Sequence, residues 1–275
     1  MSPHIRPATA EECDRIWPAI KADNLMDSAE ELRAFHAAGP WRVRVTERGE
    51  AALLGRRKAD SDVLAIRGVW CSAQHAPAFV DDAVRVARAQ GFGRVLSPLL
   101  PLEYLEPYFS AGFRVAEHIV AIQGRPNLIL RADPPIGVSI RRGGEADVEA
   151  LASLDAACFD EFWRWGAEDL TRFLTTERLA LAETDSGDLI GYTLATVNRG
   201  AATLTRLATL PEYRRHGVGR ALLADAAEWS VRAGADTIAL CTQEDNVAAR
   251  SLYVSAGLTE LDERYALAML DVREG

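Results

Sequence analysis

At 275 residues, with 48% hydrophobic and 26% charged residues, the chain has a globular composition and the length of about two domains. Lys and Arg number 31 against 40 Asp and Glu, and the resulting net charge of −9 argues against nucleic-acid binding as the main activity. No apolar run approaches the roughly 20 residues that span a bilayer, and the N-terminus lacks the apolar core of a signal peptide. The four cysteines (Cys13, Cys71, Cys158 and Cys241) are scattered, so no disulfide and no metal site is predicted. We therefore expect a cytoplasmic protein without nucleic-acid or membrane partners.

Hydrophobic periodicity and turn residues predict one order of elements that occurs twice. In the first half we expect strands at 4–7, 41–46, 51–57, 63–71, 94–97 and 113–123, and helices at 10–21, 28–38, 76–90 and 102–111. In the second half we expect strands at 139–142, 179–183, 189–197, 201–210, 236–241 and 264–270, and helices at 145–158, 167–174, 218–233 and 246–256. Residues 124–137 contain three prolines, which predicts a boundary between domains at 1–124 and 137–275.

A local sequence echo supports the repeat. Tyr-Phe-Ser-Ala-Gly-Phe from Tyr108 returns as Tyr-Val-Ser-Ala-Gly-Leu from Tyr253, 145 residues later. The glycines that end the two long helices, Gly91 and Gly234, lie 143 residues apart. Two offsets this similar indicate duplication of one fold.

The most informative stretch is Leu-Ala-Thr-Leu-Pro-Glu-Tyr-Arg-Arg-His-Gly-Val-Gly-Arg, residues 207–220. It leads from a β-branched run into a long helical pattern through Gly217 and Gly219. A strand that turns through glycines into a helix leaves backbone N–H groups free to bind an anion. Arg214, Arg215 and Arg220 make such a site suitable for phosphate. By itself the pattern is equally compatible with a basic, solvated turn, and it is neither a P-loop nor a Gly-x-Gly-x-x-Gly dinucleotide loop.

A second pattern follows the strand predicted at 236–241. On a helix, Asn246, Ala249, Arg250 and Tyr253 share one face at spacings of three and four. Asn246 can cap the helix or contact a ligand. Tyr253 is either a core tyrosine or a phenol that donates a proton to a leaving group.

Together the two patterns resemble the GNAT superfamily of acyl-CoA-dependent acyltransferases. Arg214, Gly217 and Gly219 match the family's Arg/Gln-x-x-Gly-x-Gly/Ala signature, and the later Asn…Tyr-x-x-x-Gly pattern also fits. The resemblance covers residues 139–270, whereas residues 5–123 resemble the family only in the order of elements. It implies an α/β fold of two tandem GNAT-like domains, each a mixed twisted sheet flanked by helices.

The resemblance also implies roles for individual residues. The backbone of Leu207, Ala208 and Thr209 would pair with the pantetheine arm of acetyl-CoA. The pyrophosphate would lie on the loop formed by Arg214, Arg215, His216, Gly217, Val218, Gly219 and Arg220. Asn246 would contact the cofactor, and Tyr253 would protonate the departing thiolate. The implied reaction is acetyl transfer to a primary amine of a small molecule or peptide by direct attack; the alternatives are a non-catalytic acyl-CoA-binding regulatory module and a purely structural scaffold.

Two features depart from the family pattern. Residues 203–206 carry no carboxylate where many members have a basic glutamate, which leaves Glu183, Asp160 and Glu161 as candidates without a choice among them. In the first half, Gln74 and Ala76 stand where the second half has its signature glycines, so we expect this half to be degenerate and not to bind CoA. The aromatic stretch at residues 159–165 either lines the acceptor pocket or buries the connection between two helices.

Overall fold

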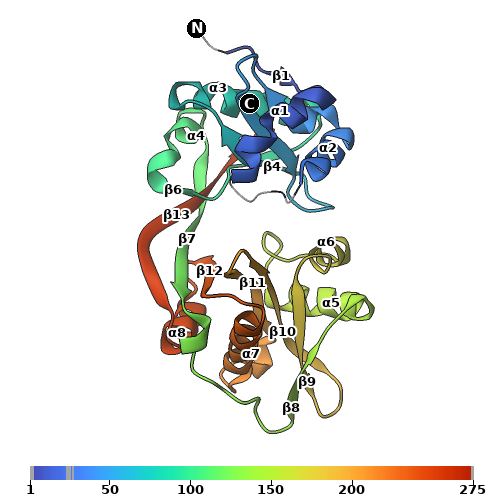
Figure 1. Cartoon of the computed structure of the whole chain (residues 1–275), viewed down its shortest axis with the longest axis vertical. Coiled ribbons are helices and arrows are strands. Elements are labelled where there is room, and N and C mark those ends of the chain that lie inside the picture. Colours follow the sequence, from blue (N-terminus) through green and yellow to red (C-terminus); the bar gives the residue numbers. More distant parts are fainter. Residues whose placement is uncertain (1–2, 23–25, 27, 274–275) are drawn as a thin grey trace. The chain divides into compact units, whose positions relative to one another are not determined.

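The computed structural model describes residues 3–22, 26 and 28–273 (Figure 1). The fold is α/β, and the chain divides into two compact units. Unit 1 comprises Met1–His118 and Tyr265–Gly275, and unit 2 comprises Ile119–Arg264. Among the helices of the described residues, none combines the length and the apolar character of a membrane span.

Unit 1 is built on a mixed sheet. Its strands are β1 (Arg6–Pro7), β2 (Val43–Val45), β3 (Ala51–Arg56), β4 (Val63–Trp70), β5 (Arg94–Leu96) and β6 (Leu100–Pro101), and its helices are α1 (Ala10–Ala22), α2 (Ala29–Ala37), α3 (Ala76–Ala89) and α4 (Glu106–Ser110). The strands from β1 to β4 pair antiparallel in chain order, and β5 adds parallel to β4. Ser28 caps α2 as expected, since its hydroxyl accepts from the Glu31 N–H at 3.1 Å.

One expected helix of unit 1 is wrong. Residues 102–111 form a short 3-10 turn, Leu102–Tyr104, and then α4, rather than one continuous helix. Pro107 lies in the first turn of α4. Because proline has no N–H and clashes with the preceding turn, a helix starts before it more readily than it continues through it.

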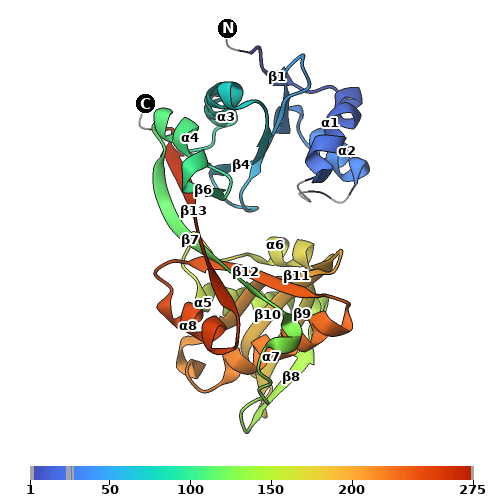
Figure 2. The same ribbon diagram turned by 60° about the vertical axis from the view of Figure 1, so that its left-hand side comes forward.

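Unit 2 repeats this plan. Its strands are β8 (Val138–Arg142), β9 (Arg178–Thr184), β10 (Leu189–Asn198), β11 (Ala201–Thr209) and β12 (Thr237–Gln243), and its helices are α5 (Val148–Cys158), α6 (Ala167–Phe173), α7 (Val218–Arg232) and α8 (Val247–Ser255). The strands from β8 to β11 pair antiparallel in order, and β12 adds parallel to β11. α5 and α6 pack on one face of this sheet, and α7 and α8 pack on the other (Figure 2).

The last strand of each repeat pairs with a strand of the other unit. β7 (Arg114–Gly124) follows α4 in the first half, yet its residues 119–124 pair with β12 in unit 2. β13 (Thr259–Asp271) follows α8, yet Met269–Asp271 pair with β5 in unit 1. The boundary at residues 124–137 was predicted from the sequence repeat. The two compact units divide the chain by packing, which places β7 and β13 differently from the repeat. The boundary between the repeats therefore stays a prediction.

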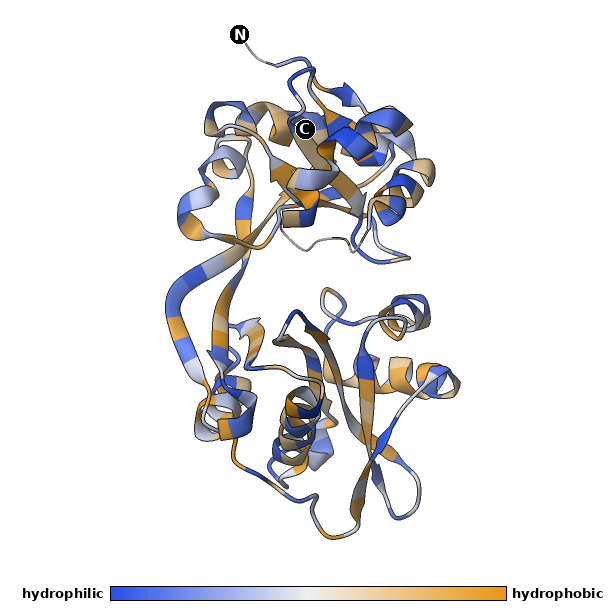
Figure 3. Ribbon diagram, in the orientation of Figure 1, coloured by the Kyte–Doolittle hydropathy of each residue, from blue (hydrophilic) through white to orange (hydrophobic). Residues whose placement is uncertain are grey.

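Each unit has its own apolar core, visible as orange strands with bluer outer helix faces in Figure 3. In unit 2, the α7 side contains Leu204, Leu223 and Tyr253 together with Val120 and Ile122 of β7. The α5 side contains Leu151, Leu170, Tyr192 and Leu194, among others. The exchanged strand is therefore part of the core of unit 2.

Candidate functional site

Strand β11 separates from β12 part-way along its length. The two strands pair only from Ala201–Thr237 to Thr203–Ala239, although they continue to Thr209 and Gln243. On its other side β11 stays paired with β10 as far as Thr209. The residues of β11 after Thr203 therefore present a backbone edge that β12 does not cover.

A β-bulge marks the start of this uncovered edge. The register of β10 against β11 moves from Ala195–Leu204 to Leu194–Arg206, which leaves Thr205 without a partner on β10. Further along, Leu210 donates to Ile190 at 2.9 Å. In an antiparallel pair alternate residues turn their N–H and C=O to the partner, so Leu207 and Thr209 direct these groups to the uncovered edge.

After β11 the chain turns into α7 through an unusual backbone. Arg215 and Gly217 both have positive φ, +66° and +91°. Left-handed backbone is strained for a residue such as Arg, and strain of this kind concentrates at functional sites. Successive turns of this type aim neighbouring N–H groups in one direction.

The amides of this turn have no protein acceptor. Within the described part of the chain, no N–H of residues 215–220 donates a hydrogen bond, and the first such bond along α7 runs from Ala221 to Gly217 at 3.0 Å. We call these six amides the amide cradle. Unbonded amides at the start of a 15-residue helix, where the helix dipole is positive, form a site for an anion.

Side chains around the amide cradle add positive charge and a polar group. Arg214 donates through Nε to the Thr209 carbonyl at 3.2 Å, which ties the turn to β11. An added Cβ at Gly219 would lie 3.4 Å from Thr209 Oγ1. That hydroxyl is buried without a partner among the described residues, so a polar group is available beside the cradle.

Asn246 is used by the fold. Its Oδ1 accepts from the Ala249 N–H at 3.2 Å, and its Nδ2 donates to Thr242 at 3.3 Å. It is the N-cap of α8, as one of the two interpretations expected. The side chain retains one amide proton for a ligand, and the cofactor contact stays a prediction.

Tyr253 lies in the core of unit 2 on the α7 side, with Leu204 of β11 and Leu240 of β12 in the same cluster. It therefore belongs to the core that β11 and β12 share. The residue is only 6% exposed, and its hydroxyl makes no hydrogen bond to any described residue. Burial raises the pKa of the phenol well above its usual value, so Tyr253 keeps its proton at neutral pH.

The stretch at 159–165 surrounds a buried ion pair. Arg206 of β11 bonds the carboxylate of Asp155 at 2.7 Å, and Asp155 is fully buried. The Arg206 guanidinium lies 3.5 Å from the Phe159 ring centroid and 4.0 Å from that of Trp165. These two aromatics therefore hold an arginine, which supports the structural interpretation for them.

The same ion pair fixes the stretch to the sheet. Asp155 accepts from the backbone N–H of Trp165 at 2.6 Å and from the hydroxyl of Tyr192. Arg206 also donates to the Trp163 carbonyl at 2.9 Å. Sequence reasoning missed this network, although Asp155 follows Leu151 by four residues on the apolar face of its helix, which was the available signal.

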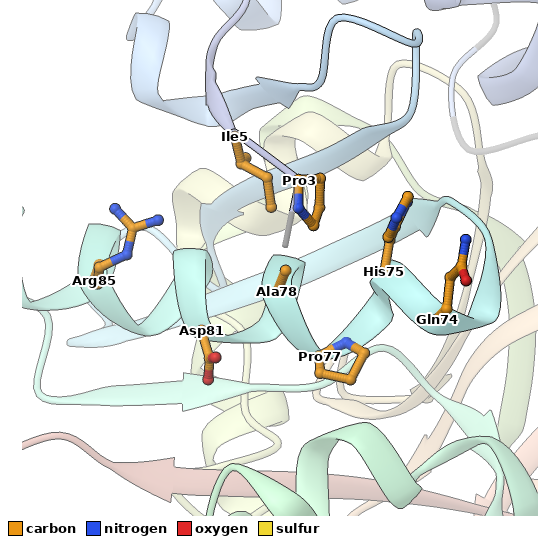
Figure 4. A pocket seen from close by; sticks show the side chains of 8 residues that line it. All are labelled: Pro3, Ile5, Gln74, His75, Pro77, Ala78, Asp81 and Arg85. Carbon is orange, nitrogen blue, oxygen red and sulfur yellow. The ribbon is translucent and has the colours of Figure 1, made fainter. Parts of the chain in front are cut away.

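In unit 1 the loop that corresponds to the amide cradle is built differently. Glu50 accepts from the Ser72 N–H at 3.1 Å and from His75 Nδ1 at 2.8 Å, so one of the chain's own carboxylates bridges the start of α3. Beside it lies an open hollow of about 500 Å³ lined by Pro3, Ile5, Gln74, His75, Pro77, Ala78, Asp81 and Arg85, in which Pro3 and Ile5 lie over the first turns of α3 (Figure 4). No described group of His, Cys, Asp and Glu could hold a metal ion.

Comparison with known proteins identifies the second half. Residues 148–258 match the model of the Acetyltransferase (GNAT) family, and the match includes the amide cradle and Tyr253. These residues are therefore similar to GNAT acetyltransferases. A curated relative, [Ribosomal protein bS18]-alanine N-acetyltransferase of Escherichia coli strain K12, is 35% identical over 77 residues, which are 28% of this chain. The chain spans about half (52%) of the length of that relative.

Solved structures resemble the whole chain. A GCN5-related N-acetyltransferase from Sphaerobacter thermophilus superposes with a TM-score of 0.68 at 17% identity, covering 99% of this chain and 97% of that one. A tandem GNAT protein from the clavulanic acid biosynthesis pathway gives 0.71 at 16% identity, covering 98% of each chain. At these identities the likeness shows the fold, and it confirms the predicted tandem α/β architecture.

Proposed function

We propose that this protein transfers an acetyl group from acetyl-CoA to a primary amine of a small molecule or a peptide. The observation that carries the proposal is the amide cradle, six unbonded N–H groups at the end of an unpaired strand edge. Both features suit a long ligand with a diphosphate at one end and an amide-containing arm at the other. The family match of residues 148–258 supports the same reaction.

The residues of unit 2 fit such a ligand. The amide cradle would hold the diphosphate, with Arg214, Arg215 and Arg220 supplying charge around it. The uncovered backbone groups of Leu207 and the N–H of Thr209 would pair with the amides of the pantetheine arm, as a further strand pairs with a sheet edge. Asn246, at the N-cap of α8, would contact the arm with its remaining amide proton.

Tyr253 would act at the sulfur. Acetyl-CoA supplies an activated acetyl thioester, whose carbonyl carbon an amine attacks directly. A backbone N–H on the uncovered edge of β11 would polarise the carbonyl oxygen. Because burial keeps Tyr253 protonated, its hydroxyl would donate a proton to the departing thiolate.

The acceptor is an amine, and a peptide N-terminus is included among the candidates. The E. coli relative is named for acetylation of an alanine in a ribosomal protein. The two halves of this chain share one fold, but only the second carries the amide cradle. We therefore propose a degenerate first half that binds no CoA.

A direct test measures thiol release from acetyl-CoA with a panel of small amines and of peptides that differ in their first residue, alanine included. We expect turnover with at least one amine and a stoichiometry of one CoA per chain by calorimetry. The second candidate is a non-catalytic acyl-CoA-binding module, which the absence of a carboxylate in residues 203–206 favours. CoA binding without turnover by any amine would select this candidate, and no CoA affinity would exclude both.

A further inference from the structure

The acids considered from sequence are engaged or exposed in the structure. Glu183 forms an ion pair with Arg141 at 2.7 Å. Asp160 and Glu161 are exposed, and Asp160 accepts from the Trp163 N–H at 3.0 Å, which closes a turn. None of the three is a free carboxylate beside the site where β11 and β12 separate.

A different acid lies at that site. Glu177 ends the turn after α6, where its N–H donates to the Phe173 carbonyl at 2.8 Å. The next residue, Arg178, pairs with Ala195 of β10, and Ala195 in turn pairs with Leu204 of β11. Glu177 therefore lies one residue before this row, and the bulge follows the row on β11.

The side chain of Glu177 reaches the bulge itself. The hydroxyl of Thr205, the bulge residue that β10 leaves unpaired, lies near enough to the Glu177 carboxylate to lower its pKa. The other carboxylate oxygen, Oε2, is buried, and none of the described residues donates to it. Leaving a buried carboxylate oxygen without a donor costs free energy, which suggests a partner that arrives with the ligand.

We propose that Glu177 receives the ammonium group of the acceptor and acts as its general base. This inference rests on the proposed acetyl transfer. The carboxylate reaches β11 from the α6–β9 turn and supplies the negative charge that residues 203–206 of the strand lack. Tyr253 packs on the α7 side, whereas Glu177 follows α6 on the opposite side, so acid and base approach the reacting atoms from two faces.

The protons balance in the proposed acetyl transfer. Glu177 takes one proton from the ammonium, which frees the nitrogen lone pair to form the C–N bond with the acetyl carbon. As the C–S bond breaks, Tyr253 gives its proton to the sulfur. The nitrogen's second proton restores the Tyr253 hydroxyl through water, and Glu177 releases its proton to solvent, so one ammonium and one thioester yield one amide, one thiol and one proton.

The test compares Glu177→Gln with Glu168→Gln, an exposed glutamate in the first turn of α6. We expect Glu177→Gln to lower kcat/KM by about 100-fold, the lower range for loss of a general base, with CoA affinity unchanged within twofold. The acidic limb of the wild-type pH profile should disappear, and Glu177→Asp should restore part of the rate. Glu168→Gln should match wild type.

A second readout needs no turnover. Burial raises the pKa of Glu177 in the folded chain by more than the nearby Thr205 hydroxyl lowers it. A raised carboxyl pKa favours the folded state at low pH, and this benefit is lost as pH rises through the folded pKa. Glu177→Gln should therefore melt higher than wild type at pH 8, and the difference should shrink toward pH 4.

The outcomes separate the two proposals. Wild-type turnover with an unchanged pH profile in Glu177→Gln overturns this inference alone. A melting difference that is absent at pH 8 also counts against it, because the carboxylate is then not held at a cost. No turnover by either chain overturns the proposed function, and the inference fails with it.

Discussion

The β11–α7 loop and the β4–α3 loop occupy equivalent places in the two units, but their backbone amides differ in hydrogen bonding. In unit 2, residues 215–220 leave six amides unbonded. In unit 1, Ser72 gives its N–H to Glu50, His75 gives its N–H to the Ser72 carbonyl, and Pro77 has none to give. We therefore expect an anion to bind the loop whose amides are unbonded, and not the loop in which the protein provides its own acceptor.

The two units also differ in the surroundings of a tyrosine that both sequences contain. Tyr108 and Tyr253 begin the same echo, and burial raises the pKa of both. Tyr253 lies in a core cluster with Leu204 of β11 and Leu240 of β12, whereas Tyr108 packs edge-on against Phe113 at 5.5 Å between ring centroids. A retained tyrosine is therefore expected to act only in the unit that retains the amide cradle.

The largest expected effect comes from separating the halves. A fragment of residues 137–275 lacks Val120 and Ile122, both fully buried in the core of unit 2, and it leaves the edge of β12 bare. Loss of two such side chains costs about 3–6 kcal/mol, which is comparable to the stability of a domain. We expect this fragment to be unfolded or aggregated by circular dichroism and size-exclusion chromatography.

Extension of the fragment to residue 114 is its control, because it restores β7. We expect this longer fragment to recover a cooperative melt. Cooperative unfolding of residues 137–275 alone would show that the exchanged strand is dispensable.

Next in size is Gly217→Val. With φ at +91°, this position strains any β-branched residue, and the shifted turn would misalign the amide cradle. We expect CoA affinity to fall at least 100-fold by calorimetry, with only a few degrees lost in Tm without ligand.

Gln74→Val is the matched change in the loop of unit 1, and we expect it to leave CoA affinity unchanged. Equal losses from both substitutions would remove the distinction between the two loops.

Tyr253→Phe tests the chemistry with little change in shape. We expect kcat to fall about 10- to 100-fold, because the thiolate then leaves without a proton from the phenol, while CoA affinity changes less than twofold. Tyr108→Phe should have wild-type kinetics. A Tyr253→Phe enzyme with normal kcat, measured by steady-state thiol release, would exclude the phenol as the acid.

The smallest effect is expected from Glu50→Gln. Burial raises the pKa of Glu50, but the hydrogen bonds from Ser72 and His75 outweigh it and hold the pKa below the usual 4.5. A depressed carboxyl pKa stabilises the fold above the unfolded value, and this stability is lost as pH falls through the folded pKa. Glu50→Gln should melt a few degrees below wild type at pH 7 and equal it near pH 3.

The same variant tests the loop of unit 1. Without glycines at residues 74 and 76 the loop should still bind no CoA, so calorimetry should again give one site per chain. A second site would show that Glu50 alone suppresses binding there.

The sequence alone determined the local features. The glycines at 217 and 219, the arginines around them and the strand-to-helix pattern were sufficient to predict an anion-binding turn, because turn geometry depends on residues that are close in the chain. The repeated order of elements followed from periodicity and from the echo at Tyr108 and Tyr253, and the resemblance to the GNAT superfamily implied the tandem α/β architecture. Pro107 was a sequence signal for the break that precedes it, although one continuous helix was expected over residues 102–111.

Only the tertiary structure decided which distant residues meet. The exchange of β7 and β13, the burial of Arg206 against Asp155, and the approach of Glu177 to Thr205 join residues 28 to more than 150 positions apart. Hydrophobic patterning predicts that a strand end is apolar, but it does not predict which sheet edge that strand will pair with. The sequence likewise does not distinguish a glutamate on the surface from one beside a strand bulge. The two differ in pKa, because burial and hydrogen bonding set the pKa of a carboxylate.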